Sequence, residues 1–540
     1  MNQIASTAGV VAAPHYLATN VGTNILSDGG NAFDAAVGVA LTIGVAQPYH
    51  SGLGGGCNIT YLQASGEHGH INARGPAPAG LSRDMFFDDG TPNYTRLQTG
   101  GLASTIPSFV AGLWALHKRR GNLPWADICA RPAAIAAEGF TADFMMAKVY
   151  SQASTAAKVA KYAQTTEFAA PIAEGQYVVQ PQLAETLTAI GKDARSIYTG
   201  DVAKALVDTI NSHGGVLSLQ DLADYQPQHT DLHETHYRGW RVLAPGLPTI
   251  GSLQTQLALK ILQHFPLDTL TCGSAQHMHL LAEVVKATYH MRASIDDEQA
   301  AAAIADDAQA ERLAAGISLD KVQALRLGHD GDGSCTSHFC VADVDGNVVS
   351  QTQTVRSYFG SGVVCPTTGI VLNDSAGDFS LQAGQITTQG ISYQGDYNLL
   401  AAGSEPASSQ SPLIALHPDT GDVIAAGAAG GPRIVSATLQ ALTNQIDFEH
   451  SPQQAVAARR VHSHGAGINV EASAHMAQAL SSLGHTIKAT PSMGITQSIR
   501  RDGETWQGGA DPRGPGGAAV VLQTGDTMTV RRYGTSYGDA

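Results

Sequence analysis

Charge is scarce in this sequence, and positive charge is the scarcer kind. Asp, Glu, Lys and Arg make up 14% of the 540 residues, against roughly 25% in ordinary soluble domains. Acidic residues outnumber basic ones by 46 to 31, and the longest basic run is Lys118-Arg119-Arg120. Because nucleic-acid binding depends on clusters of Lys and Arg, we expect no nucleic-acid partner.

Long hydrophobic runs are missing as well. The most apolar stretch, residues 35–46, is shorter than the ~20 residues that a membrane-spanning helix needs. We therefore expect a buried helix here and no membrane association. No Lys or Arg precedes Arg74, so the start of the chain lacks the positively charged region of a secretory signal, and we expect a cytoplasmic protein.

Paired cysteines and nucleotide-binding motifs are also absent. The six cysteines form no CxxC pair, which predicts reduced, mostly buried thiols rather than a zinc site or a disulfide framework. They are Cys57, Cys129, Cys272, Cys335, Cys340 and Cys365. The glycine-rich segment 51–56 lacks the Gly-Lys-Ser/Thr ending of a phosphate-binding loop. We expect neither a cofactor nor a metal ion.

Glycine is abundant, at 59 residues, and the apolar spacing predicts a layered α/β protein. Residues 107–291 are mainly of helical pattern, whereas strand-like alternation dominates after residue 336. This order of helical and strand-like segments along the chain predicts an α/β/β/α sandwich. Expected helices are 31–46, 108–120, 125–138, 181–190, 203–212, 274–293, 434–446 and 453–458. Expected strands are 58–62, 237–243, 337–342, 348–354, 369–372, 413–416 and 423–426, with a hairpin turn at 343–347.

The most informative stretch is residues 331–341, GDGSCTSHFCV. A flexible Gly/Asp run ends at a small hydroxyl residue and continues as a strand, which is typical of an exposed, cleavable connection. If the bond between Cys335 and Thr336 were cut, the new α-amine, with a pKa of roughly 7.7 to 8, would sit beside the Thr336 hydroxyl and activate it as a nucleophile. The structural alternative is that the Thr336 side chain only hydrogen-bonds to nearby backbone groups.

Several motifs in order resemble the γ-glutamyltranspeptidase family of N-terminal nucleophile hydrolases. They are GGNAFDAA at 29–36, SGLGGG at 51–56, TSHF at 336–339 followed by DVDGN at 343–347, SSQSP at 408–412, GGPRI at 430–434 and DPR at 511–513. The resemblance spans nearly the whole chain. It implies a four-layer αββα fold that processes itself into a large chain, 1–335, and a small chain, 336–540, forming one intertwined catalytic unit.

The resemblance also implies roles for individual residues. Thr336 resembles the nucleophile and Thr354 the hydroxyl that hydrogen-bonds to it. Gly430 and Gly431 resemble the pair whose N–H groups form the oxyanion hole. Substrate-binding positions are Arg74, Ser408 and Ser409 for the α-carboxylate and Asp378 for the α-ammonium.

Two positions depart from the family pattern. Arg356 stands where γ-glutamyl enzymes usually have asparagine, and Ser375 where they have Gln or Glu. An arginine added near Arg74 favours further negative charge and disfavours an α-ammonium. The chain thus resembles the cytoplasmic oxamate amidohydrolases of purine breakdown, and oxamate is the expected substrate, converted to oxalate and ammonia.

Other functions stay open on sequence grounds. They are a γ-glutamyl hydrolase or transferase, a cephalosporin-type acylase, and a non-catalytic relative that binds small carboxylates. The expected partners are a small anionic amide and the two chains of one precursor. A homodimer of αβ units is left open, and so is whether Tyr358 and Phe359 close over the site or pack in the core.

Overall fold

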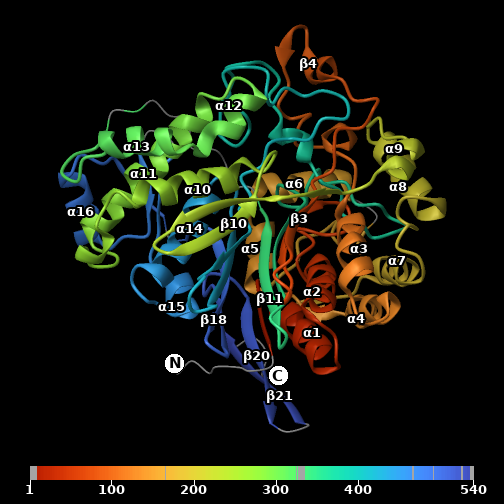
Figure 1. Cartoon of the computed structure of the whole chain (residues 1–540). Helices are drawn as coiled ribbons and strands as arrows, with labels where there is room; N and C mark the ends of the chain where they lie inside the picture. The colour runs from red at the N-terminus through yellow and green to blue at the C-terminus, as the bar shows by residue number, and fades with distance from the viewer. Residues whose placement is uncertain are drawn as a thin grey trace.

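Two β-sheets face each other between two layers of helices (Figure 1). This computed structural model describes residues 9–163, 166–323, 325, 335–464, 467–490, 492–524 and 527–534. The proposed junction residues 331–334 lie outside the described residues, whereas Cys335 and Thr336 lie within them. The four-layer αββα sandwich expected from the sequence is confirmed.

The first sheet has eight strands within the described residues. In spatial order they are β21 (Thr527–Gly534), β20 (Gly517–Thr524), β1 (Gly9–Ala13), β11 (Ser337–Asp343), β12 (Val348–Thr354), β2 (Gly56–Leu62), β3 (His68–Ala73) and β8 (Gln228–Thr230). Strand β1 pairs with β20 on one side and with β11 on the other. Strands from before and after Thr336 therefore interleave in this sheet.

The second sheet has six strands in the described part of the chain. Their order is β19 (Thr505–Ala510), β18 (Ile495–Asp502), β14 (Val423–Ala429), β13 (Leu413–Leu416), β10 (Trp240–Pro245) and β9 (Leu232–Tyr237). A short hairpin is formed by β4 (Phe87–Asp88) and β5 (Thr91–Pro92), and β6 (Phe140–Thr141) pairs with β7 (Tyr177–Val178), which follows α5 (Phe144–Tyr150) and α6 (Ala153–Tyr162) in the chain. A small three-stranded sheet contains β15 (Val461–His462), β16 (Ile468–Val470) and β17 (Ile487–Ala489).

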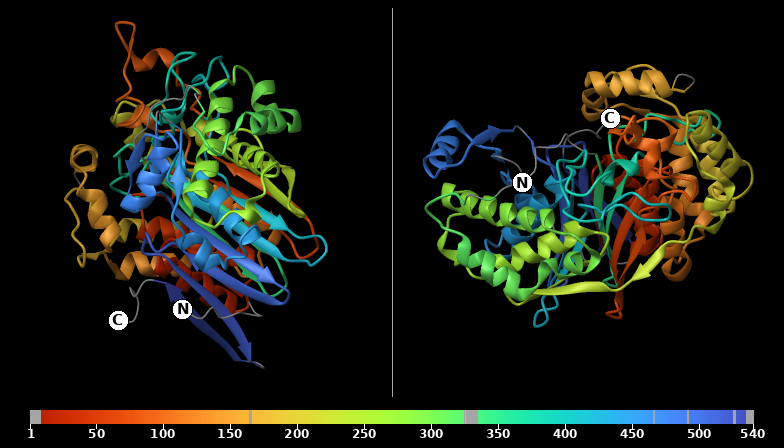
Figure 2. Two further views of the ribbon diagram at one scale, coloured as in Figure 1. Left: turned by 90° about the vertical axis from the view of Figure 1, so that its left-hand side faces the viewer. Right: turned by 90° about the horizontal axis from the view of Figure 1, so that it is seen from above.

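Helices cover the outer face of each sheet, on opposite sides of the molecule (Figure 2). The eight-stranded sheet is covered by α1 (Tyr16–Ser27), α2 (Ala32–Ala46) and α3 (Phe109–Arg120), with α4 (Trp125–Glu138), α5 (Phe144–Tyr150), α6 (Ala153–Tyr162), α7 (Pro181–Lys192), α8 (Gly200–Ser212) and α9 (Leu219–Asp224) further out. The other side carries α10 (Ile250–Leu262), α11 (Ala275–Ala293), α12 (Glu298–Ala302), α13 (Asp307–Gly316), α14 (Arg433–Ile446), α15 (Pro452–Ala457) and α16 (Ala474–Ser482).

The core follows these layers. One apolar cluster lies between α1–α4 and the eight-stranded sheet, a second lies between the six-stranded sheet and α10, α11 and α14, and a third fills the space between the sheets with residues such as Val10, Cys340 and Ile414. Burial of apolar surface on this scale is the main stabilising term of the fold. Within the described ranges, no helix combines the length and apolar character needed to cross a bilayer.

Two distant motifs meet at the start of α2. Asn31 caps the helix by accepting hydrogen bonds from the N–H groups of Phe33 and Asp34, as its sequence position predicts. Asp343, at the end of β11, accepts a further hydrogen bond from the N–H of Ala32 (2.9 Å) and one from Asn347 across the hairpin turn (2.9 Å). The turn therefore fixes both the β11–β12 hairpin and the position of α2.

Most expected elements are confirmed, with small differences at their ends, but two strands are wrong. The expected strand 237–243 crosses a hairpin turn, because Arg238 and Gly239 both have positive φ (49° and 86°) and separate β9 from β10. The expected strand 369–372 forms only isolated bridges, including Val364 with Val371. All six cysteines are free, and all but the half-buried Cys272 are buried, as predicted.

Candidate active site

Thr336 lies directly before β11 and lines the cavity described below. Its side chain is buried, and its Oγ1 lies 2.5 Å from the carbonyl oxygen of Cys335 and 3.3 Å from Oγ1 of Thr354, the last residue of β12. The Thr354 hydroxyl donates to the same carbonyl (2.6 Å) and accepts from the N–H of Arg356 (2.8 Å). Two hydroxyl groups therefore contact the carbonyl of the predicted scissile bond.

A small, partly open cavity lies beside Thr336. It is lined by Arg74, Thr336, Thr354, Arg356, Asp378, Gln389, Ser408, Ser409, Gln410, Gly431 and Ile434. The structure thus brings together almost all the site residues expected from the sequence. Ser375 and Gly430 are outside the lining: Ser375 is buried with its N–H on Asn373 Oδ1 (3.0 Å), and its short side chain does not reach the cavity.

Gly430 and Gly431 form the turn between β14 and α14. Their φ angles are 127° and 60°, in the region that favours glycine. The carbonyl of Gly431 accepts the N–H of Ile434 (3.0 Å), which starts the helix. The N–H of Gly431 has no acceptor among the described residues, and Gly431 is one of the residues that line the cavity. A free N–H at a helix N-terminus is suited to stabilising a developing oxyanion.

Asp378 is held between two arginines. Nη2 of Arg74 donates to one carboxylate oxygen (2.6 Å) and Nε of Arg356 donates to the other (2.6 Å). Arg356 also binds Asp374 (2.9 Å) and the Gly377 carbonyl (3.0 Å). Burial works against the charge of Arg356, but Asp378 and Asp374 outweigh it and raise the Arg356 pKa. Both oxygens of Asp378 are thus occupied by guanidinium groups.

This packing leaves no space beside Arg356. A Cβ at residue 377 would lie 2.5 Å from the guanidinium carbon of Arg356, so only glycine fits against it. Arg356 itself has a φ of 84°, a strained value for a side chain of this size. The ion pairs hold the strained residue in place, which fixes the guanidinium against Asp378.

Several donors in the cavity are unused. Nε of Arg74 and Nε2 of Gln410 are buried and have no partner in the described structure. The hydroxyl oxygens of Ser408 and Ser409 accept hydrogen bonds, from the N–H of Gln410 (3.1 Å) and from Arg292 (2.7 Å) respectively, so their hydrogens can still be donated. An anionic group is the ligand that would satisfy such a set of donors.

Arg292 contributes to this character from behind Ser409. It is 2% exposed, and its recorded partners are neutral: the Tyr393 hydroxyl (2.9 and 2.7 Å), Gln254 (3.0 Å) and Ser409. A buried cation bound only by neutral groups leaves a positive potential around it. The Ser409 side of the cavity therefore favours negative charge as well.

Comparison with known proteins identifies the family. The family model described as gamma-glutamyltranspeptidase matches residues 18–521. The chain belongs to this family. The glutathione hydrolase proenzyme of Pseudomonas aeruginosa is 33% identical over 535 residues, with 95% of this chain and 94% of the relative covered. The acylase ACY 1 proenzyme of Pseudomonas sp. is 30% identical, with 89% and 88% covered.

A solved structure shares the whole fold. The cephalosporin acylase from Bacillus halodurans superposes with a TM-score of 0.84 at 27% identity and covers 97% of this chain and 98% of its own. Together with the family match, this shows that the chain is an amidohydrolase of the γ-glutamyltranspeptidase type, an enzyme that acts on amide C–N bonds. The relatives' names as proenzymes agree with processing of one precursor into two chains.

Some residues of this family site were missed in the sequence. Gln410 lies inside the SSQSP motif, so its place next to two expected binding residues was the available signal. Asp374 and Gln389 carry no such signal, because their contact with the site depends on the loop that follows β12. Phe359 is fully buried against Tyr150 and Phe168, and Tyr358 stacks on His50, so the core-packing alternative holds for this pair.

Proposed function

We propose that this chain cleaves its own Cys335–Thr336 bond and then hydrolyses the amide of a small substrate that carries a carboxylate. The observation that supports it most strongly is the set of unused donors on Arg74, Gln410, Ser408 and Ser409 in a cavity that also contains Thr336. Both reactions use the Thr336 hydroxyl, so one nucleophile explains processing and turnover.

Processing begins with attack of Thr336 Oγ1 on the carbonyl carbon of Cys335, which is bonded to the oxygen 2.5 Å away. The C–N bond breaks, the nitrogen of Thr336 takes the proton and becomes an amine, and an ester joins the two residues. The Thr354 hydroxyl, 2.6 Å from the carbonyl oxygen, stabilises the developing negative charge. Water then hydrolyses the ester, leaving a carboxylate on Cys335 and a free hydroxyl on Thr336.

Turnover repeats this chemistry on the substrate. The α-amine of Thr336 takes the proton from its own hydroxyl, which attacks the amide carbonyl. The N–H of Gly431, at the N-terminus of α14, stabilises the oxyanion, and Arg74 with Ser408 and Ser409 binds the carboxylate. The amine delivers the proton to the departing nitrogen, and water then releases the acyl group from Thr336.

Oxamate is our first choice of substrate. It places one carboxylate directly beside the scissile amide, which suits a small cavity with donors close to Thr336. It has no ammonium group, and both oxygens of Asp378 are already bound by Arg74 and Arg356. We extend the proposal to a cytoplasmic enzyme of purine breakdown, in line with the resemblance to oxamate amidohydrolases.

Two other substrates have support from the relatives. The names of the glutathione hydrolases support glutathione, and therefore a γ-glutamyl amide, as the substrate, and the names of the acylases support an acyl amide such as a cephalosporin. Steady-state rates with oxamate, a γ-glutamyl anilide and a glutaryl amide separate the three. We expect the highest kcat/KM for oxamate, and turnover of the γ-glutamyl compound alone would refute that choice.

Processing itself is tested by intact-mass analysis. We expect two chains, 1–335 and 336–540, that copurify as one unit, and a single uncut chain for Thr336→Ala. A wild-type protein that stays at full length after prolonged incubation would contradict the mechanism. It would favour the remaining alternative, a non-catalytic protein that binds small carboxylates.

A further inference from the structure

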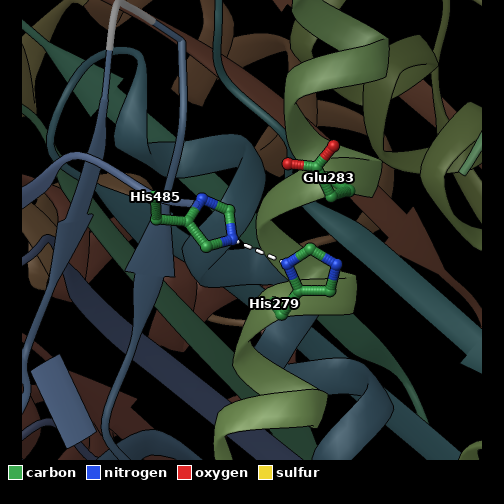
Figure 3. A group of neighbouring side chains, drawn as sticks. All are labelled: His279, Glu283 and His485. Atoms are coloured by element: carbon green, nitrogen blue, oxygen red, sulfur yellow. Dashed lines mark hydrogen bonds between the residues drawn. The ribbon is translucent and has the colours of Figure 1, made fainter. Parts of the chain in front are cut away.

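A second cluster of reactive side chains lies away from Thr336, between α11 and the segment after α16. His279 and Glu283 are four residues apart on α11 and so share one face of the helix, and His485 approaches them just before β17 (Figure 3). They are 0%, 0% and 6% exposed. Their ligand atoms all lie within 4.8 Å of one another.

Neighbouring groups orient these three side chains. The ring nitrogen Nε2 of His279 lies 2.8 Å from the carbonyl oxygen of Ser318. A carbonyl only accepts, so Nε2 carries the proton and a neutral ring presents the lone pair of Nδ1 to His485 Nε2, 2.7 Å away. Glu283 Oε2 accepts the N–H of Gln323 (2.8 Å). A carbonyl behind one histidine and an N–H behind the carboxylate are the outer partners typical of metal ligands.

We propose that His279, Glu283 and His485 bind one divalent cation of the zinc class. Two imidazole nitrogens and one carboxylate oxygen form a ligand set that Zn²⁺ accepts in proteins, with water in the fourth position. Two nitrogen atoms that each lie about 2.05 Å from a tetrahedral zinc ion are about 3.3 Å from each other. Nδ1 of His279 and Nε2 of His485, now 2.7 Å apart, must therefore separate by about 0.6 Å, and the proton on Nε2 of His485 must move to Nδ1 of the same ring.

The site would join the two chains of the processed enzyme. His279 and Glu283 precede Thr336 in the chain, and His485 follows it. His279 and Glu283 also hydrogen-bond to Ser318 and Gln323, which lie in the segment that precedes the proposed cleavage site. A bound ion would thus fasten the end of the large chain to the small chain. This linking role, unlike the binding itself, rests on the proposed processing.

Lys286 is the competitor for this site. Its ammonium forms a buried ion pair with Oε1 of Glu283 and also contacts the Gln323 carbonyl (3.3 Å). A positive charge so close repels an incoming cation. Lys286→Met removes the charge and keeps the length of the side chain. We expect it to tighten Zn²⁺ binding at least tenfold, and unchanged or weaker binding would refute Glu283 as a ligand.

The decisive measurement is metal binding by the untagged full-length protein after removal of metals with a chelator. Titration with Zn²⁺ alone should show one tightly bound ion per enzyme molecule, whether cut or uncut. Co²⁺ alone should give the visible absorption of a tetrahedral site. His485→Gln should weaken binding at least a hundredfold. His475→Gln, which removes an exposed imidazole from α16, is the matched control and should leave binding unchanged.

Thr336→Ala separates this proposal from the processing mechanism. The uncut chain contains the same ligands, so it should bind the same equivalent of Zn²⁺ whether or not cleavage occurs in the wild type. Absence of a tight equivalent in both proteins would overturn the metal site. Binding that His485→Gln and His475→Gln weaken equally would also overturn it, because surface histidines would then be the ligands.

Discussion

Replacing Arg356 with asparagine tests what the cavity selects. The substitution introduces the residue usual at this position in γ-glutamyl enzymes and removes the guanidinium that donates to Asp378 at 2.6 Å. Asparagine tolerates the φ of 84° better than arginine does. One oxygen of Asp378 is then freed from a charged partner and can accept the α-ammonium of a γ-glutamyl substrate.

The expected gain follows from one new charge-assisted hydrogen bond. Such a bond contributes about 1.5 to 3 kcal/mol, which corresponds to about 10-fold to 150-fold in kcat/KM. We expect the kcat/KM for a γ-glutamyl anilide to rise by that factor relative to the kcat/KM for oxamate. The folded state should lose about 3 kcal/mol, because Asp374 and Asp378 lose a partner in a buried ion pair.

The assay compares the two substrates in wild type, Arg356→Asn and Arg356→Lys. Lysine keeps the charge but lacks the forked geometry, so it should keep the wild-type preference even if the rate falls. Intact-mass analysis shows that each variant is processed before its rates are compared. A ratio of kcat/KM values that is the same in all three proteins would refute the idea that Arg356 excludes the ammonium.

Three further outcomes follow from the site and the buried histidines. Gly431→Ala should lower kcat about a hundredfold with little change in KM, because the oxyanion donor is displaced in the transition state. Gln410→Glu replaces an unused donor with a negative charge and should lower kcat/KM for a carboxylate substrate at least tenfold, and an equal loss with a neutral amide would contradict this. Burial lowers the pKa of both His70 and His338 to about 3, so they stay neutral when folded but bind protons when unfolded below about pH 6.5. The free energy of unfolding should therefore fall on acidification, by about 2 kcal/mol for each residue from pH 7.5 to pH 5. Denaturant unfolding of the uncut Thr336→Ala chain measures it. A free energy of unfolding that does not change with pH, or a pH dependence that His70→Gln leaves unchanged, would contradict this prediction.

The strands next to Thr336 could be predicted well because their signals are local. Residues 337–342 and 348–354 alternate around a DVDGN turn, and β11 and β12 have almost these bounds. The hairpin of β9 and β10 was misjudged because Arg238 at positive φ is not a common turn signal. Helix α10 lies inside the stretch 107–291, for which the sequence predicts mainly helix, but the sequence analysis gives it no bounds of its own.

The residues of the site could be predicted more fully than their interactions. Arg74, Arg356 and Asp378 were each named, and an excess of positive charge was expected from the two arginines. The structure pairs both arginines with Asp378, so the proposed preference for an anion rests on unused donors and on Arg292 rather than on free guanidinium charge. His485 could not be linked to His279 from sequence, because 206 residues separate them.

The interleaved strand order of the eight-stranded sheet affects how each enzyme molecule can fold before and after cleavage. Strand β1 lies between β20 and β11, so neither chain of the processed enzyme would contain the complete eight-stranded sheet. Folding is thus a unimolecular event that is available once, before the cut, and later unfolding yields two fragments that must find each other again. We expect the uncut Thr336→Ala chain to refold after denaturation at a yield independent of concentration. The native state of the processed enzyme would instead persist because its unfolding barrier is high, as in a protease whose pro-segment is removed after folding.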